Sequence, residues 1–239
     1  MIIYKFMNLQ PLTFNLVTVF SLLAFILSAC GPATPTAEPQ IVDVYATSAA
    51  QPWLTKLYAC AANSGTVLKV NAESPEIYLR VGEPDVFVFP TYQIDEEDLI
   101  VVMNYARPPL ITGTQIKELF TGKISNLNHI TSEWGEVHVG STGEVHVWVY
   151  SSDDDIQKTF EQIVLSGSTV TSQAHVAANP QDMLNQIAKD ENSIGYLPRH
   201  WLGNGVFEQA VVATVPVLAV TKSEPQGLVV DLISCLQNN

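Results

Sequence analysis

Short apolar runs of strand length alternate with helical patterns along most of this chain, and this alternation constrains its fold more than any other feature. Residues 99–103 (LIVVM) form a continuous apolar run, which is typical of a strand covered on both faces. Further strands are expected at residues 42–46, 66–70 and 77–81. Strands that alternate with helices in this way predict an α/β layered fold.

Capping signals mark the starts of two of the intervening helices. Thr112 with Gln115 three positions later is a capping-box pattern, and Asn179 followed by Pro180 is an N-cap with proline at the first helical position. Helical patterns also predict helices over residues 52–62 and from residue 224 onward.

Three consecutive aspartates stand at the start of another predicted helix. The apolar side chains that follow have the spacing of one buried helix face, and they are Ile156, Phe160, Ile163 and Val164. The aspartates therefore occupy the first turn, where free backbone N–H groups could hold an anion. They are Asp153, Asp154 and Asp155.

The N-terminal segment predicts export. Lys5 is the only charged residue before an apolar run that ends in Leu27-Ser28-Ala29-Cys30, and this order describes a signal peptide over residues 1–29. Leu-Ser-Ala-Cys resembles the lipobox of bacterial lipoproteins, in which the cysteine becomes the lipid-modified first residue. The alternative is an uncleaved anchor, because about 18 apolar residues can just span a bilayer. Both interpretations place the rest of the chain at the extracytoplasmic face of the cell membrane.

A tether follows the predicted lipidation site. Residues 30–40 hold Cys30 and a Pro- and Thr-rich stretch without large apolar side chains, so they are expected to stay semi-extended. Residues 30–239 carry 10 Lys and Arg against 24 Asp and Glu, a net charge of −14. Such an acidic chain disfavours nucleic acid and electrostatic docking to anionic lipid, so the lipid on Cys30 is expected to supply the membrane attachment.

Two cysteines remain in the exported part. Cys60 and Cys235 each lie on the apolar face of a predicted helix. Disulfides persist outside the cytoplasm, and a Cys60–Cys235 bond would close a long loop between the start and the end of the fold. We predict that bond; two buried free thiols are the alternative.

Five segments then follow one another in order: ATSAAQPWLTKLY, TGTQIKELFTGKISN, VYSSDDDIQKTFEQIVL, NSIGYLP and VPVLAVTKSEPQGLVVDLISCLQ. Together they resemble the phosphate-binding-type solute receptors of bacterial ABC importers, which are type 2 periplasmic binding proteins. The resemblance implies two α/β lobes joined by two crossing strands, with lobe 1 formed by residues 41–103 plus 212–239 and lobe 2 by 104–211. It also implies a monomer that binds a small solute between the lobes and delivers it to an ABC permease, without a cofactor.

The same resemblance implies which loops line the cleft. Hydroxyls, helix-start N–H groups and one arginine are what a desolvated tetrahedral oxyanion such as phosphate requires. The implied ligand-binding residues are Thr47, Ser48, Arg80, Gly82, Glu83, Ser151, Ser152 and Asp153. Taken residue by residue, the hydroxyls of Thr47 and Ser48 could instead cap the helix that follows them. Arg80 could form a structural ion pair. Glu83 could bind a cationic group or belong to a solvated turn.

The aspartates depart from the Ser-Gly-Thr that phosphate receptors have at this helix start. Aspartate there ordinarily stabilises a helix as a cap and against its dipole. A carboxylate about 4 Å from a bound anion costs roughly 4 kcal/mol at an effective dielectric constant of 20. That exceeds the roughly 1.5–3 kcal/mol that a charged hydrogen bond contributes, so these residues argue against phosphate as the ligand.

A metal site and an enzymatic activity are not expected. Residues 135–150 pair Glu136 with His138 and Glu144 with His146, each on one strand face. A two-residue turn at 141–142 would separate the two histidines, whereas a three-residue loop at 141–143 would bring them together. Nucleophile-elbow, HExxH and P-loop motifs are lacking in the sequence.

Two functional alternatives stay open. One is a non-transport binding or sensory module on the same fold, with a cationic or polar solute in place of phosphate. The other is a metal-dependent surface enzyme, which would require the two histidines to converge.

Overall fold

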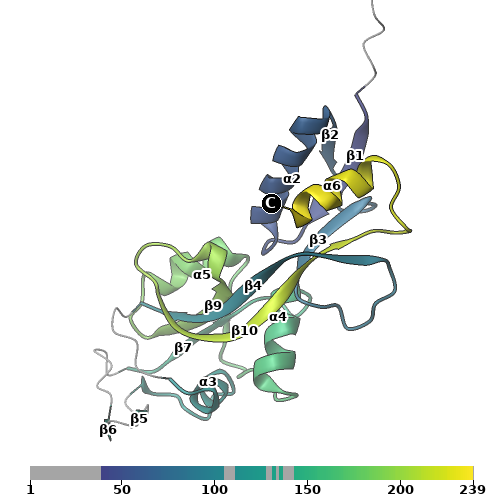
Figure 1. Cartoon of the computed structure of the whole chain (residues 1–239). Coiled ribbons are helices and arrows are strands. Elements are labelled where there is room, and N and C mark those ends of the chain that lie inside the picture. Colours follow the sequence, from purple (N-terminus) through teal and green to yellow (C-terminus); the bar gives the residue numbers. More distant parts are fainter. Residues whose placement is uncertain (1–38, 105–110, 128–130, 133–134, 137–142, 239) are drawn as a thin grey trace, which may run out of the picture. The chain divides into compact units, whose positions relative to one another are not determined.

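The computed structural model describes residues 39–104, 111–127, 131–132, 135–136 and 143–238 (Figure 1). Residues 39–239 form one compact unit with a continuous buried core. The predicted signal peptide, the lipid site at Cys30 and most of the tether lie outside the described residues. Within the described ranges, the helices are too short or too polar to cross a membrane.

A single eight-stranded sheet organises the unit in the order β2-β1-β3-β10-β4-β9-β7-β8. In chain order these strands are β1 (Ile41–Ala46), β2 (Val67–Val70), β3 (Ile77–Val81), β4 (Thr91–Met103), β7 (His146–Val149), β8 (His175–Val176), β9 (Ser193–Pro198) and β10 (Phe207–Val220). A separate pair joins β5 (Thr131–Ser132) to β6 (Gly135–Glu136).

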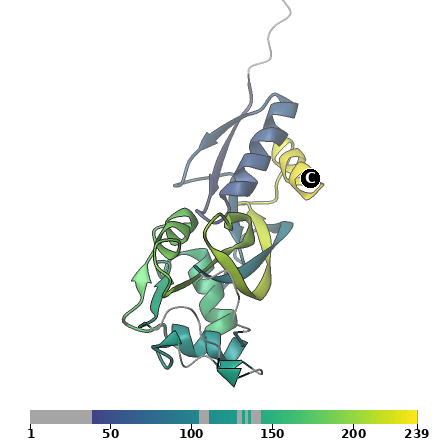
Figure 2. The same cartoon turned by 90° about the vertical axis from the view of Figure 1, so that its left-hand side faces the viewer.

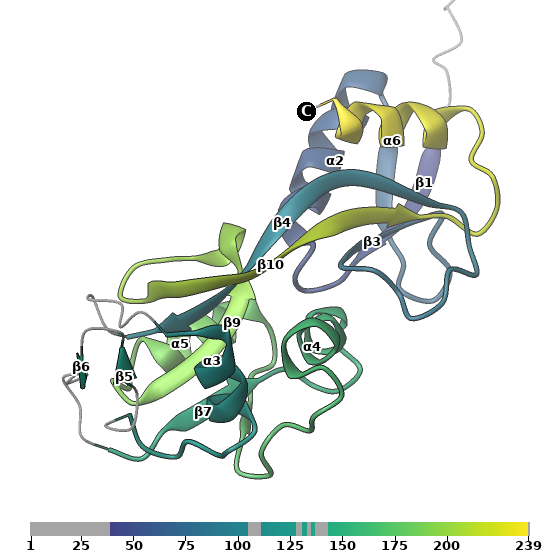
Figure 3. The same cartoon turned by 60° about the horizontal axis from the view of Figure 1, so that its bottom comes forward.

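Two long antiparallel strands connect the two halves of this sheet. β10 pairs with β3 through its last residues, whereas β4 pairs with β9 through residues 99–103. Along most of their length β4 and β10 pair with each other (Figure 3). The structure therefore has the two crossing strands and the mixed α/β architecture that the sequence predicts. The exact residue boundaries of the two lobes stay a prediction.

Helices accompany each half (Figures 1 and 2). α2 (Gln51–Ser64) and α6 (Leu228–Gln237) pack against each other beside β1–β3, which we call the first half. β7–β9 are accompanied by α3 (Gly113–Phe120), α4 (Asp155–Phe160), α5 (Pro180–Ile187) and the 3-10 turn η3 (Arg199–Trp201), which we call the second half. The predicted caps are confirmed, because Thr112 and Gln115 form a capping box and Asn179 accepts a hydrogen bond from the Asp182 N–H.

Alternation along β1 and β3 gives the first half one buried and one half-exposed face. Val42, Val44 and Ala46 are buried in β1, as are Ile77, Leu79 and Val81 in β3. Four half-exposed residues follow on the other face, and we call them the open face: Tyr45, Thr47, Tyr78 and Arg80. Since successive side chains of a strand point to opposite sides, these polar and aromatic groups gather on one surface.

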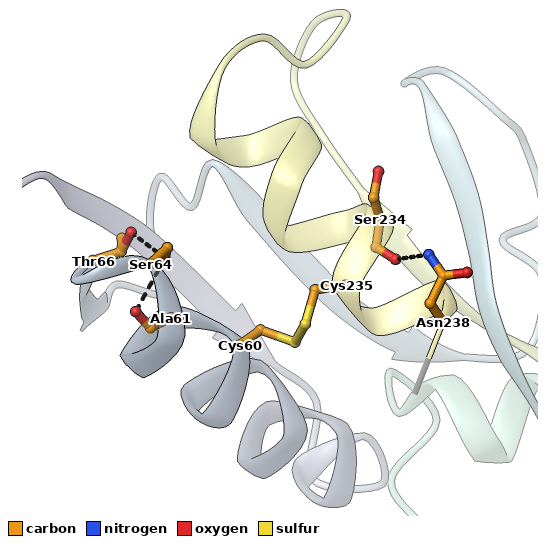
Figure 4. The surroundings of a disulfide bond; sticks show 7 residues. All are labelled: Cys60, Ala61, Ser64, Thr66, Ser234, Cys235 and Asn238. Atoms are coloured by element: carbon orange, nitrogen blue, oxygen red, sulfur yellow. Dashed lines mark hydrogen bonds between the residues drawn. A yellow bond between two sulfur atoms is a disulfide. The ribbon is translucent and has the colours of Figure 1, made fainter.

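Cys60 and Cys235 are joined by a disulfide that links α2 to α6 (Figure 4). The bond connects residues 175 positions apart, so it closes nearly the whole compact unit into one covalent loop. In each helix the cysteine lies on the side that packs against the other helix, as the apolar spacing predicts.

The helix after the three aspartates differs from the prediction. α4 ends at Phe160 and continues as the π-helix η2 (Glu161–Leu165). The wider turn shifts the buried face by one residue, so Leu165 is buried while Ile163 is 44% exposed. The prediction that Ile163 faces inward is therefore wrong.

The last helix also begins later than predicted. α6 starts at Leu228 rather than at Glu224. Gly227, with φ 54°, occupies the position before the first turn, and this left-handed conformation interrupts a helix.

Candidate functional site

A cavity of about 510 Å³ lies between the two halves. The first half contributes the open face and Ser48. The second half contributes the loop before α4, one turn of α4, and the end of β8 with the segment after it; the lining residues are Ser151, Asp153, Asp154, Asp155, Lys158, Val176, Ala177 and Ala178. The loops near residues 47 and 151–155 therefore meet across the cavity, as the resemblance implies.

Two tyrosines form one wall of this cavity. Tyr45 and Tyr78 are direct neighbours in the parallel register of β1 and β3. Their rings stack with centroids 5.8 Å apart and an interplanar angle of 9°. Burial raises the pKa of Tyr78, so its hydroxyl stays neutral at physiological pH. The pair therefore places two aromatic rings at the cavity.

Asp155 connects the two halves. Its Oδ2 accepts hydrogen bonds from the Thr47 hydroxyl at 2.8 Å and from the Val81 backbone N–H at 2.9 Å. Its Oδ1 accepts from the Ile156 N–H at 3.0 Å, and the residue is only 5% exposed. A hydroxyl and a backbone N–H are donors that would suit an oxyanion. In this chain they already hold a carboxylate of the protein itself.

Asp154 makes a second, weaker link across the cavity. Its Oδ1 accepts from the Ile156 N–H at 2.9 Å as the N-cap of α4, and its Oδ2 lies 3.4 Å from the Ser48 hydroxyl. Burial, followed by the adjacent negative charge of Asp155, raises the pKa of Asp154 to about 6. Asp154 thus caps the helix, as one reading of the sequence predicts, and also faces the first half.

Asp153 behaves differently from its neighbours. The residue is exposed, and a hydrogen bond from Ser151 lowers the pKa of its carboxyl group. It therefore remains ionised at the mouth of the cavity. Of the three aspartates, it is the one whose carboxylate is most accessible to a solute.

Arg80 and Lys158 supply positive charge to the same cavity. The Arg80 Nη2 donates to the Glu83 carbonyl at 3.2 Å. Its Nε is buried and has no partner among the described residues. Formally, three carboxylates and two cations line the cavity, so its lining carries a slight excess of negative charge.

Five of the predicted ligand-binding residues line the cavity together: Thr47, Ser48, Arg80, Ser151 and Asp153. Neither Thr47 nor Ser48 caps α2, because its N-cap is Ala50 and no side chain caps it. The helix-capping alternative for these two hydroxyls is therefore wrong. Instead they donate to the aspartates of the opposite half.

Three other predicted residues do not line the cavity: Gly82, Glu83 and Ser152. Gly82 has φ 81°, and a Cβ atom there would lie 2.2 Å from the Thr159 hydroxyl oxygen. Its role is thus to let the chain after β3 approach α4 closely. Whether these eight residues bind a solute stays a prediction.

The main residues that the sequence reasoning missed are Asp155 as the link between the halves, and Tyr45 with Tyr78. The tyrosines could have been found, since strand alternation places Tyr45 on the side of Thr47 and Tyr78 on the side of Arg80. The contact of Asp155 with Thr47 joins residues 108 positions apart and carries no local signal.

The predicted hairpin around the two histidines can be followed only in part. His138 lies outside the described residues. His146 in β7 lies with its Nδ1 2.5 Å from Asp190 Oδ2. Among the described residues, three or more metal-binding side chains do not cluster anywhere.

Comparisons with known proteins support the fold. No family model matches the chain, and no curated protein matches it. A phosphate ABC transporter substrate-binding protein from Clostridium perfringens, solved with bound phosphate, superposes with a TM-score of 0.68 at 16% identity, covering 82% of this chain and 93% of that one. An ABC-type phosphate transport receptor from Vibrio cholerae gives 0.60 at 13% identity, with 83% and 93% coverage.

A different kind of protein shares the architecture. The reduced regulatory domain of OxyR2 from Vibrio vulnificus superposes with a TM-score of 0.59 at 7% identity, covering 87% of this chain and 99% of that domain. The chain therefore has the type 2 periplasmic-binding-protein fold. Within that fold it is similar to phosphate receptors of ABC importers, at identities that establish the architecture alone.

Proposed function

We propose that this protein is an extracytoplasmic, lipid-anchored solute-binding protein that holds a small solute between its two halves and presents it to an ABC permease. The observation that carries the proposal is a cavity of about 510 Å³ lined by both halves, whose loops are joined at the cavity by the hydrogen bond between Thr47 and Asp155. Its volume lies within the roughly 300–1,000 Å³ of small-molecule sites. The similarity to two phosphate receptors supports the same reading.

The solute differs from free phosphate in this proposal. Thr47 and the Val81 N–H already donate to Asp155, so a tetrahedral anion would have to displace a covalently tethered carboxylate. It would also meet the charges of Asp153 and Asp154. A polar solute with a positively charged group, such as an amine, finds two partly accessible carboxylates there and stacked tyrosine rings whose faces attract cations.

Solute binding would act through closure of the halves. β4 and β10 are the long connecting strands, so a small change in their twist would move the second half relative to the first. A solute shifts the equilibrium only by its difference in affinity for the open and closed states. Contacts to both the open face and the α4 loop supply that difference, because only the closed state makes all of them.

A sensory or non-transport binding role is the second candidate. The OxyR2 regulatory domain, which shares the fold, favours it. The two candidates differ in whether a permease recognises the closed form, so co-purification of the solute-loaded protein with a permease would separate them.

The test is a thermal-shift screen of residues 39–239, the compact unit, against phosphate, sulfate, molybdate, tungstate, primary amines and divalent metals. We expect an amine to raise the melting temperature and phosphate to leave it unchanged. The amine shift should be lost in Asp153→Asn. A phosphate shift that disappears in Ser151→Ala, a residue that lines the cavity, would contradict the proposed charge of the solute.

A further inference from the structure

A second cavity, of about 430 Å³, lies next to the first on the open face. It is lined by Tyr45, Ala72, Glu73, Pro75, Tyr78, Phe89, Val220, Thr221 and Lys222. Tyr45 and Tyr78 line both cavities, so the stacked pair forms their common wall.

The two cavities differ in chemistry. The first is bordered by carboxylates, hydroxyls and two cations. In the second, the aromatic rings are joined by Pro75, Phe89 and Val220, whose side chains carry no polar groups. One of its charged residues already has a partner, because Lys222 Nζ donates a hydrogen bond to the Ser74 hydroxyl. A solute that spans both cavities would need one polar end and one apolar end.

Phe89 is placed at the end of an exposed apolar run, residues 86–89, in the loop between β3 and β4. It is 52% exposed although it lines the second cavity, so much of its ring remains available to an occupant. Burying apolar surface is favourable by roughly 25 cal/mol per Å². An exposed phenylalanine beside two tyrosine rings is therefore a place where an apolar group would bind.

We propose that the solute of this protein carries an apolar body, aliphatic or aromatic, that lies against Tyr45 and Tyr78 and reaches Phe89 in the second cavity, while its polar head occupies the first. This inference rests on the proposed function, and it names the class of solute. The occupant is part of a small molecule and not a partner protein, because the second cavity shares its ring wall with the polar cavity. A molecule that extends past these two rings would fill both.

The test is isothermal titration calorimetry of residues 39–239 with primary n-alkylamines of two to eight carbons and with n-alkylcarboxylates of the same lengths. We expect the affinity of the amines to rise roughly fourfold per added methylene until the second cavity is filled. Phe89→Ala should remove most of that gain for the longer chains while leaving ethylamine binding unchanged. Phe87→Ala is the matched control, because Phe87 is 57% exposed in the same run but does not line the cavity.

Each other outcome decides a separate point. Binding that does not depend on chain length would overturn the inference while solute binding in the first cavity stands. Carboxylates that show the chain-length gain where amines do not bind would uphold the apolar body and contradict the positive head. Equal losses in Phe87→Ala and Phe89→Ala would mean that the alkyl chains bind the exposed run, and the inference would fail. It would fail equally if neither series bound.

Discussion

Asp155 Oδ2 accepts a hydrogen bond from Thr47 Oγ1 at 2.8 Å, across the cavity that separates the two halves of the sheet. The same oxygen accepts from the Val81 N–H, so one buried carboxylate satisfies donors from two loops of the first half. In a receptor for a free anion, such donors would be available to the ligand. Here the protein carries its own anion.

Replacing Asp155 by Asn should destabilise the fold. The amide cannot accept from Thr47, Val81 and Ile156 as the carboxylate does, and its NH₂ group would face donors. We expect a loss of about 1–3 kcal/mol in the free energy of unfolding, measured by urea denaturation. Asp153→Asn, at an exposed position, is the matched control and should change stability little. Equal stability of the two variants would contradict the role given to Asp155.

Replacing Asp154 by Asn should make stability less dependent on pH. Because the pKa of Asp154 is raised to about 6, the folded state binds this proton more tightly than the unfolded chain does. The contribution of this protonation to the free energy of unfolding is fully present below the ordinary aspartate pKa of 3.8. It is lost as pH rises through about 6.

Asp154→Asn keeps a good N-cap residue and removes the charge. The variant should therefore be more stable than wild type at pH 7.5, with an advantage that shrinks as pH falls from 6 to 4. Urea unfolding of both proteins at several pH values measures the difference, in which titrating groups remote from Asp154 cancel. An advantage that grows on acidification would refute the assignment.

Gly82→Ala should destabilise the protein through two effects. The φ of 81° strains any residue with a Cβ atom, and the new Cβ would lie 2.2 Å from the Thr159 hydroxyl oxygen. Gly65→Ala is the matched control, because Gly65 has φ 68° and nothing within 4 Å of an added Cβ. Thermal melts should show a loss of more than about 1 kcal/mol for Gly82→Ala and a smaller loss for Gly65→Ala. Similar losses would mean that close approach to α4 is unimportant.

Removing the disulfide should lower stability without changing the fold. The Cys60→Ala/Cys235→Ala variant frees a loop of 175 residues in the unfolded chain. A loss of about 2–5 kcal/mol is expected from native disulfides of exported domains. Wild type in the presence of dithiothreitol should show the same decrease in melting temperature. Two alkylatable thiols in the native protein would show that the bond does not form.

Local patterns predicted much of this structure. The capping box at Thr112 and the N-cap at Asn179 formed as expected, because caps depend on residues within one turn. The strand at 77–81 and the last part of β4, residues 99–103, were likewise evident from their apolar residues. These signals lie in neighbouring residues, and tertiary packing did not override them.

The Cys60–Cys235 bond was predicted, but several other features that depend on distant contacts were not. The π-helix after Phe160 changes which residues face inward, and an ideal 3.6-residue period cannot anticipate it. The link between Asp155 and Thr47 forms only once the two halves are in place. The second cavity depends on a loop around Phe89 that has no periodic pattern. The site geometry therefore depends on distant contacts, whereas most of the elements around it follow from local patterns.

The central claim is that a small solute binds between the two halves and contacts both. Its most direct test is a ¹H–¹⁵N NMR titration of residues 39–239 with the amine that gives the largest thermal shift. The account predicts shifts of the backbone amides of Thr47 and Ser48 together with those of residues 151–155. Shifts confined to one half, or located away from these loops, would contradict it.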